Sequence, residues 1–180
     1  MKRKITQTIN VPNGINFEIR QDSIIFTKNS STISRQINSP NIRIEKEGDT
    51  LKIYSEKATK NQYKIMMALI AHIKNIFSGL DKKFVYELEA VNVHFPMTLK
   101  SEGQKVLISN FLGEKTPRYA KILPNVNVEI KGQKITVSSS DREAAGQTAA
   151  NLETATIIKG RDRRIFQDGI FITSKPGRLS

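Results

Sequence analysis

Hydrophobic and polar residues alternate along much of residues 5–55, and this two-residue period predicts β-strands. Turn-forming residues separate the alternating stretches: Pro12-Asn13-Gly14 marks one turn, and Gly48-Asp49 lies between two strands that form a hairpin. The strands expected in this part of the chain are Ile5–Val11, Ile15–Ile19, Ser23–Thr27, Thr32–Ile37, Ile42–Glu45 and Leu51–Ser55.

The period then changes to that of a helix. Hydrophobic residues recur every three or four positions, which predicts one amphipathic helix ending near Gly79. The positions that carry this pattern are Tyr63, Met66, Met67, Ile70, Ile73 and Phe77.

The second half of the chain repeats this order of strands followed by a helix. Ser140 with Glu143 three residues later forms a capping box, which predicts that Ser140 begins the second helix. Small residues line that helix, and Gly146 within it costs about 1 kcal/mol relative to Ala, which indicates either close packing at this position or close approach by another group. The strands expected are Phe84–Val91, which links the halves, and then Val93–Leu99, Lys105–Ser109, Ala120–Ile122, Val126–Ile130 and Lys134–Ser138.

Shifting the sequence by 84 residues brings the two halves into register without a gap. Among the matched positions, Pro12 meets Pro96 and Gly48 meets Gly132. A sheet needs a second layer to bury one face, and each half offers one helix for this purpose. The sequence therefore predicts an α+β protein of two tandem copies of a small domain, each an antiparallel sheet plus one helix, spanning residues 1–80 and 81–180.

Composition restricts the function. The chain has 29 Lys plus Arg against 17 Asp plus Glu, a net charge of +12, which favours a polyanionic partner: nucleic acid first, an anionic membrane surface second. There is no cysteine, which excludes disulfides, thiolate metal sites and a cysteine nucleophile. The longest apolar run, Ile65–Ala71, is too short to span a membrane, so we expect a soluble, non-secreted protein.

The positive charge gathers in three segments of the second half. Each segment alone is also typical of a solvated loop, but three in one half favour a binding surface, and arginine suits bidentate phosphate contacts. The candidate residues are Lys159, Arg161, Arg163 and Arg164 in the first segment, Lys115, Arg118 and Lys121 in the second, and Lys175 and Arg178 near the end of the chain.

No constellation of catalytic residues is visible in the sequence. His72 and His94 are the only histidines, and neither has a carboxylate at an obvious spacing, so both are interpreted as structural. Two alternatives to an RNA-binding protein stay open: an architectural protein of double-stranded DNA, and a hydrolase whose site is dispersed along the chain.

Three motifs carry a resemblance to a known family: NFLGEKTPRYAKI (Asn110–Ile122), DREAAGQTAANLE (Asp141–Glu153) and GRDRRIFQDGIFIT (Gly160–Thr173). They resemble the sixth protein of the large ribosomal subunit, in its archaeal and eukaryotic form. The resemblance implies two copies of a small α+β fold and a structural, non-enzymatic component of the cytoplasmic ribosome with no cofactor, metal, membrane or small-molecule substrate.

The resemblance also implies where the protein acts. It places the chain on large-subunit rRNA near the sarcin–ricin stem, supporting the factor-binding region, beside neighbouring large-subunit proteins. In the family the second domain makes most rRNA contacts, which implies that role for residues 81–180 and for the nine candidate cations.

Overall fold

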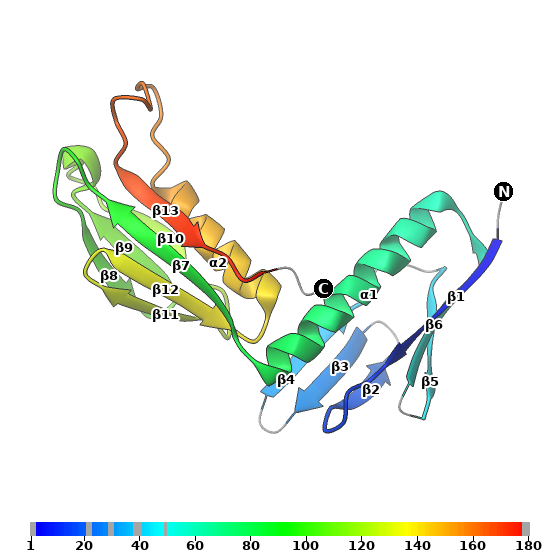
Figure 1. Ribbon diagram of the computed structural model, residues 1–180. Helices are drawn as coiled ribbons and strands as arrows, with labels where there is room; N and C mark the ends of the chain where they lie inside the picture. The colour runs from blue at the N-terminus through cyan, green and yellow to red at the C-terminus, as the bar shows by residue number, and fades with distance from the viewer. Residues whose placement is uncertain (1–2, 21–22, 29–30, 38–40, 49, 178–180) are drawn as a thin grey trace. The chain divides into compact units, whose positions relative to one another are not determined.

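The computed structural model describes residues 3–20, 23–28, 31–37, 41–48 and 50–177. The chain divides into two compact units, Met1–Lys82 and Lys83–Ser180. Figure 1 shows that each unit combines antiparallel strands with one long helix.

Unit 1 forms two three-stranded antiparallel sheets, in the orders β1-β6-β5 and β2-β3-β4. Helix α1 packs on β6 and β3, where the ring of Phe77 meets that of Phe26 edge-on, with 5.4 Å between centroids. The alternating hydrophobic residues of the strands are buried in this core, as the two-residue period predicted. The elements are β1 (Arg3–Asn10), β2 (Asn16–Arg20), β3 (Ser23–Lys28), β4 (Ser31–Gln36), β5 (Arg43–Glu47), β6 (Thr50–Ala58) and α1 (Lys60–Asp81).

Unit 2 forms a four-stranded antiparallel sheet, β11-β12-β7-β13, and a three-stranded one, β10-β9-β8. Helix α2 packs against β7, β12 and β13 of the larger sheet and against β10 of the smaller one (Figure 1). The elements are β7 (Phe84–Val91), β8 (Thr98–Glu102), β9 (Lys105–Ser109), the 3-10 helix η1 (Phe111–Gly113), β10 (Arg118–Lys121), β11 (Asn127–Lys131), β12 (Lys134–Ser139), α2 (Arg142–Ala155) and β13 (Gly169–Ser174).

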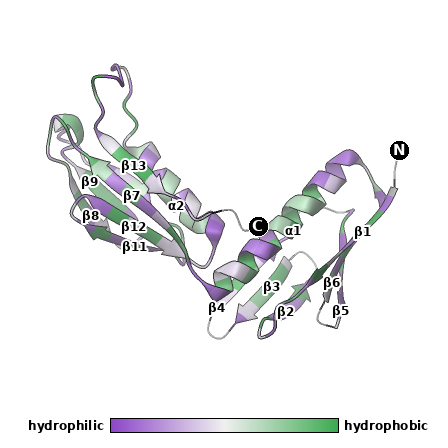
Figure 2. Ribbon diagram, in the orientation of Figure 1, coloured by the Kyte–Doolittle hydropathy of each residue, from purple (hydrophilic) through white to green (hydrophobic). Residues whose placement is uncertain are grey.

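The predicted α+β fold of two repeated units is confirmed. Ile44 pairs with Ile53 in unit 1, and Val128 pairs with Val137 at the same register in unit 2. The hairpin glycines Gly48 and Gly132 both have a positive φ, +60° and +63°, which residues other than glycine rarely adopt. Figure 2 shows the alternation of hydrophobic and hydrophilic residues along the strands.

Three local predictions were wrong. The strand predicted at Phe84–Val91 is confirmed with the same bounds, but its role as a link between the halves is wrong, because it is β7, an inner strand of the larger sheet of unit 2. The strand expected at Val93–Leu99 begins only at Thr98, as β8. The N-cap of α2 is Asp141 and not Ser140: its carboxylate accepts a hydrogen bond from the Glu143 N–H at 2.9 Å. Strand β13 was not among the strands predicted.

Neither described helix is long and apolar enough to cross a membrane.

Tyr86 explains the glycine inside α2. A Cβ at Gly146 would lie 2.9 Å from the Tyr86 hydroxyl oxygen and 3.3 Å from Cζ of the same ring. The strand β7 thus brings an aromatic side chain against the helix, so the close approach expected from the sequence comes from within the protein.

Gly146→Ala is expected to destabilise the protein by about 1 kcal/mol, because the overlap with Tyr86 costs more than the gain in helix propensity. In a Tyr86→Phe background, which removes the hydroxyl, the same substitution is expected to stabilise by about 0.5 kcal/mol. Urea unfolding of the four proteins of this double-mutant cycle measures both values. Additive effects would contradict the contact.

Candidate nucleic-acid interface

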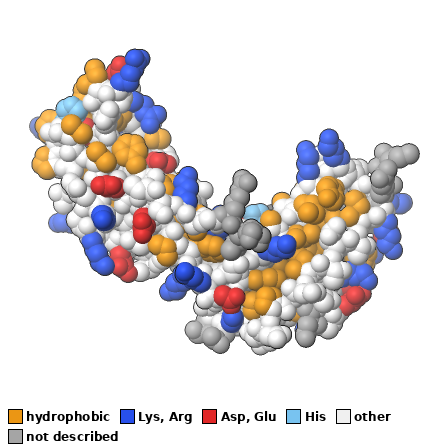
Figure 3. Space-filling view, in the orientation of Figure 1, with side chains coloured by type: hydrophobic (Ala, Val, Ile, Leu, Met, Phe, Trp, Pro, Cys, Tyr) orange, Lys and Arg blue, Asp and Glu red, His pale blue; other side chains and the backbone are white. Residues whose placement is uncertain are grey.

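The loop between α2 and β13, residues 157–168, carries the densest group of cations. Lys159, Arg161, Arg163 and Arg164 are all exposed on it, and the Arg164 side chain retains 92% of its accessible surface. Figure 3 shows Lys and Arg side chains at the tip of this loop. The predicted cluster is therefore available to solvent and to a partner.

Thr156 fixes the start of the loop. It is buried at the C-terminal end of α2, and its hydroxyl accepts a hydrogen bond from the Ile170 N–H at 2.8 Å while donating to the Glu153 carbonyl at 3.2 Å. This one side chain joins the end of α2 to the start of β13, so the two ends of the loop are held close together.

Asp168 fixes the end of the loop. Its carboxylate is 3% exposed and accepts hydrogen bonds from the Val93 and His94 N–H groups at 2.8 and 3.0 Å, and it lies 2.6 Å from His94 Nδ1. Burial alone would raise the pKa of Asp168, but these hydrogen bonds from His94 and Val93 outweigh it and hold the pKa below its usual value. The carboxylate is thus ionised at neutral pH.

A chain of ring contacts extends from Asp168 to the loop cations. The His94 ring stacks on Phe166 with 4.9 Å between centroids, and the Arg161 guanidinium lies 4.8 Å from the centroid of the same Phe166 ring. The sequence identified neither Asp168 nor the partner of His94, because the two residues are 74 positions apart. His94 has the structural role predicted for it, now with a specific function: it positions Phe166 beneath Arg161.

Arg118 differs from the other candidate cations because protein acceptors surround its guanidinium. It donates two hydrogen bonds to the Glu114 carboxylate, at 2.6 and 2.8 Å, and others to the Ala155 and Ile157 carbonyls, at 3.0 and 3.2 Å. It also lies 4.4 Å from the ring centroid of Phe111. Hydrogen bonding to Arg118 holds the pKa of Glu114 below its usual value.

These contacts bring two of the three basic segments together. Because Arg118 bonds to the end of α2 and the start of the loop, the segment that carries exposed Lys115 lies next to the loop. Exposed Lys121 is at the other end of β10, where its carbonyl accepts a hydrogen bond from Asn151 Nδ2 at 2.9 Å, further from the loop. Lys175 is exposed but follows the far end of β13, away from the loop, and Arg178 lies outside the described residues.

In the described part of the chain, no group of three or more His, Cys, Asp or Glu side chains is placed to hold a metal ion.

Comparisons with known proteins identify the family. The model of the ribosomal protein L6 family matches residues 95–169, which include the anchored loop. The chain is 38% identical to large ribosomal subunit protein uL6 of Methanococcus vannielii, over 97% of this chain and 96% of that protein. It is 39% identical to the protein of the same name from Methanosarcina mazei, over 97% of this chain and 99% of the relative.

The fold, the cationic loop and these matches together define a structural protein of the large ribosomal subunit. The chain belongs to the ribosomal protein L6 family. The resemblance noted in the three sequence motifs is thereby confirmed, as are the expectations that the protein is not an enzyme and that it is located on the cytoplasmic ribosome. Binding to rRNA is typical of this family.

Proposed function

We propose that the chain binds large-subunit rRNA mainly through unit 2, near the sarcin–ricin stem, and supports the region where translation factors bind. Lys159, Arg161, Arg163 and Arg164 make the central contacts, and Lys115 and Lys121 extend them. The observation that carries this proposal is the loop itself, which exposes four cations while both of its ends are tied to the fold. The place on the rRNA is taken from the resemblance of the sequence motifs.

The geometry suits double-helical RNA. Its major groove is too deep and narrow for side chains to read, so proteins recognise its shape, phosphates and 2′-hydroxyls. A loop whose ends are anchored presents its cations with less loss of conformational entropy on binding than a free tail. Among the loop cations, Arg161 should lose the least conformational entropy on binding, because its guanidinium already lies against the Phe166 ring.

Arg118 has a different part in this proposal. Its hydrogen bonds join β10 to the end of α2, so it positions the basic segments and is not a primary phosphate ligand. Lys175 and Arg178 form a separate, peripheral contact. Neighbouring large-subunit proteins are the other partners.

Sedimentation of a native lysate through a sucrose gradient at about 0.1 M monovalent salt tests the assignment. The protein is expected to co-migrate with large subunits, because many phosphate contacts act together. A protein that stayed at the top of the gradient would contradict stable residence on the subunit and would make binding to duplex DNA the next hypothesis to test.

A further inference from the structure

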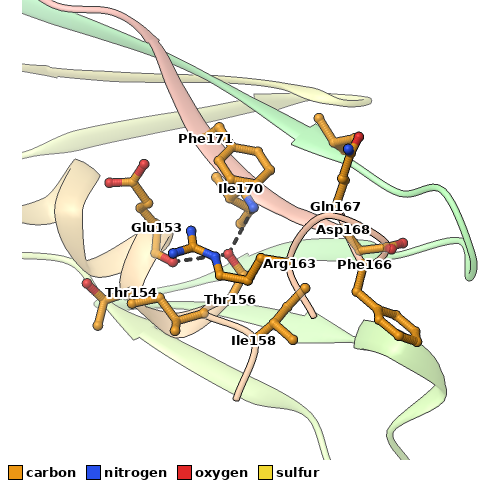
Figure 4. A pocket seen from close by; sticks show the side chains of 12 residues that line it. Glu153, Thr154, Thr156, Ile158, Arg163, Phe166, Gln167, Asp168, Ile170 and Phe171 are labelled. Atoms are coloured by element: carbon orange, nitrogen blue, oxygen red, sulfur yellow. Dashed lines mark hydrogen bonds between the residues drawn. The ribbon is translucent and has the colours of Figure 1, made fainter. Parts of the chain in front are cut away.

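A pocket of about 630 Å³ lies beside the cationic loop, between the end of α2, the loop and the start of β13. Figure 4 shows Ile170 and Phe171 together at one side of the pocket and Ile158 at the other, near Thr154 and Arg163. The contacts described above do not fill this space. We propose that it receives one unpaired RNA base, guanine in preference to the others; this inference rests on the proposed function.

The side of the pocket with Ile170 and Phe171 fits the flat face of a base. Phe171 is 37% exposed, and it makes no ring-stacking contact with another aromatic or cationic side chain among the described residues. Phe166, in contrast, already contacts His94 and Arg161. Single-stranded RNA bases commonly stack on exposed aromatic rings of this kind.

The charge pattern separates the base from its phosphate. Glu153 and Arg163 both line the pocket, so that the Glu153 carboxylate can accept hydrogen bonds from the N–H groups of a base while the Arg163 guanidinium can donate to a carbonyl oxygen of the base. The cations Lys159, Arg161 and Arg164 stand outside the pocket on the exposed loop, where a sugar–phosphate backbone would run. A nucleotide placed with its base inside and its phosphate on the loop therefore satisfies both signs of charge.

The same carboxylate gives a preference among bases. Guanine presents two adjacent donors, N1–H and the exocyclic amino group, which match the two oxygens of a carboxylate. Uracil presents a single N–H between two carbonyl oxygens, which a carboxylate repels. Guanine is therefore the favoured base and uracil the least favoured.

The test uses the full-length protein, isotopically labelled for NMR, and guanosine 5′-monophosphate as the probe. We expect the signals of Ile158, Ile170 and Phe171 to shift with saturation as guanosine 5′-monophosphate is added. The dissociation constant for uridine 5′-monophosphate should be several-fold larger, and inorganic phosphate should shift none of these signals. Equal shifts with phosphate alone would show a phosphate site and overturn the proposal.

Two substitutions in the pocket make the test specific. Phe171→Leu is expected to weaken the binding of guanosine 5′-monophosphate about tenfold, a loss typical of one stacked base. Glu153→Gln is expected to remove the preference for guanine over uracil. Tyr63→Leu replaces an exposed aromatic residue of unit 1 and is the matched control, with no change expected. Unchanged binding in both pocket variants would overturn the proposal.

Binding to a large-subunit rRNA fragment distinguishes the two levels of inference. If the native chain binds the fragment but Phe171→Leu and Glu153→Gln bind it equally well, the base pocket is wrong and the rRNA-binding proposal stands. If the native chain does not bind the fragment, the proposed function itself fails.

Discussion

Neutralising the four loop cations together, as Lys159→Gln, Arg161→Gln, Arg163→Gln and Arg164→Gln, is expected to weaken rRNA binding about a thousandfold at 0.1 M monovalent salt. Each lost phosphate contact removes the release of one counterion from the RNA, which is worth about sixfold at this salt concentration, so that four contacts together give about a thousandfold. The Gln side chains keep the loop polar and disturb little packing, because all four positions are exposed. Filter binding to a large-subunit rRNA fragment measures the loss.

The salt dependence identifies the mechanism behind this loss. With about six phosphates neutralised, the native chain should show a log–log slope of roughly −5, so that raising salt from 0.1 to 0.4 M weakens binding about a thousandfold. The quadruple variant should retain a slope of roughly −2 and lose only about tenfold over the same range. A flat salt response of the native chain would contradict phosphate binding.

A matched control distinguishes the effect of the loop cations on RNA binding from the effect of the protein's net charge. Four exposed lysines of unit 1 can be changed to Gln with the same loss of four charges: Lys57, Lys60, Lys64 and Lys74. This variant is expected to change the slope by less than about one. An equal effect of the two variants would mean that the net field of the protein, and not the loop, determines binding.

Asp168→Ala is expected to destabilise unit 2 by about 3 kcal/mol, the largest effect on stability predicted for a single polar residue here. The substitution removes a buried carboxylate, leaves the part-buried N–H groups of Val93 and His94 without their side-chain acceptor, and removes the charged partner of the His94 ring. Urea unfolding measures the loss. A value below about 1 kcal/mol would show that water replaces the carboxylate.

Asp162→Asn is the control for this prediction. Asp162 lies in the same loop but is half exposed, and its Oδ1 accepts one hydrogen bond from the Arg164 N–H, which an Asn side chain can also accept. A change of less than about 0.5 kcal/mol is expected. The loss of stability caused by Asp168→Asn should lie between those of Asp168→Ala and Asp162→Asn, because this substitution keeps the shape of the Asp168 side chain but not its charge.

The stability contributed by Asp168 should depend on pH in a defined direction. Hydrogen bonds from His94 and Val93 lower the pKa of its carboxyl in the folded protein, so the folded state favours the charged form. The contribution is therefore complete above the unfolded value and is lost as pH falls through the lower, folded pKa. The difference in stability between the native protein and Asp168→Asn should be constant above about pH 5 and shrink below pH 4.

The repeated fold could be predicted from the sequence because its signals are local. Alternation within strands, helical spacing after residue 60 and the hairpin glycines each concern neighbouring residues, and the 84-residue offset joins them into two copies. The exposed cationic loop could be predicted in the same way, since charged runs without periodicity favour loops.

The features that could not be predicted depend on residues far apart in the sequence. Val93 and His94 alternate with their neighbours as a strand would, but their N–H groups bond to Asp168 and not to another strand, so β8 begins later. Arg118 looks like any other basic residue until its bonds to the end of α2 are known. Ser140 and Asp141 are both good N-caps, and their order in sequence does not decide between them.

The position of β7 has a consequence for the order in which the protein folds during synthesis. β7 begins unit 2 and β13 ends it, yet the two strands pair, with Leu88 opposite Ile172. Contacts between such distant residues form slowly, because the intervening chain must lose entropy before they are made. In unit 1, by contrast, every described strand pairing lies within residues 3–58.

A nascent chain can therefore complete the sheets of unit 1 while unit 2 is still being translated. One edge of β7 stays unpaired until β13 has been synthesised, and the Asp168 anchor can form only after residue 168 has been added. The loop proposed to bind RNA therefore becomes ordered later than the sheets of unit 1.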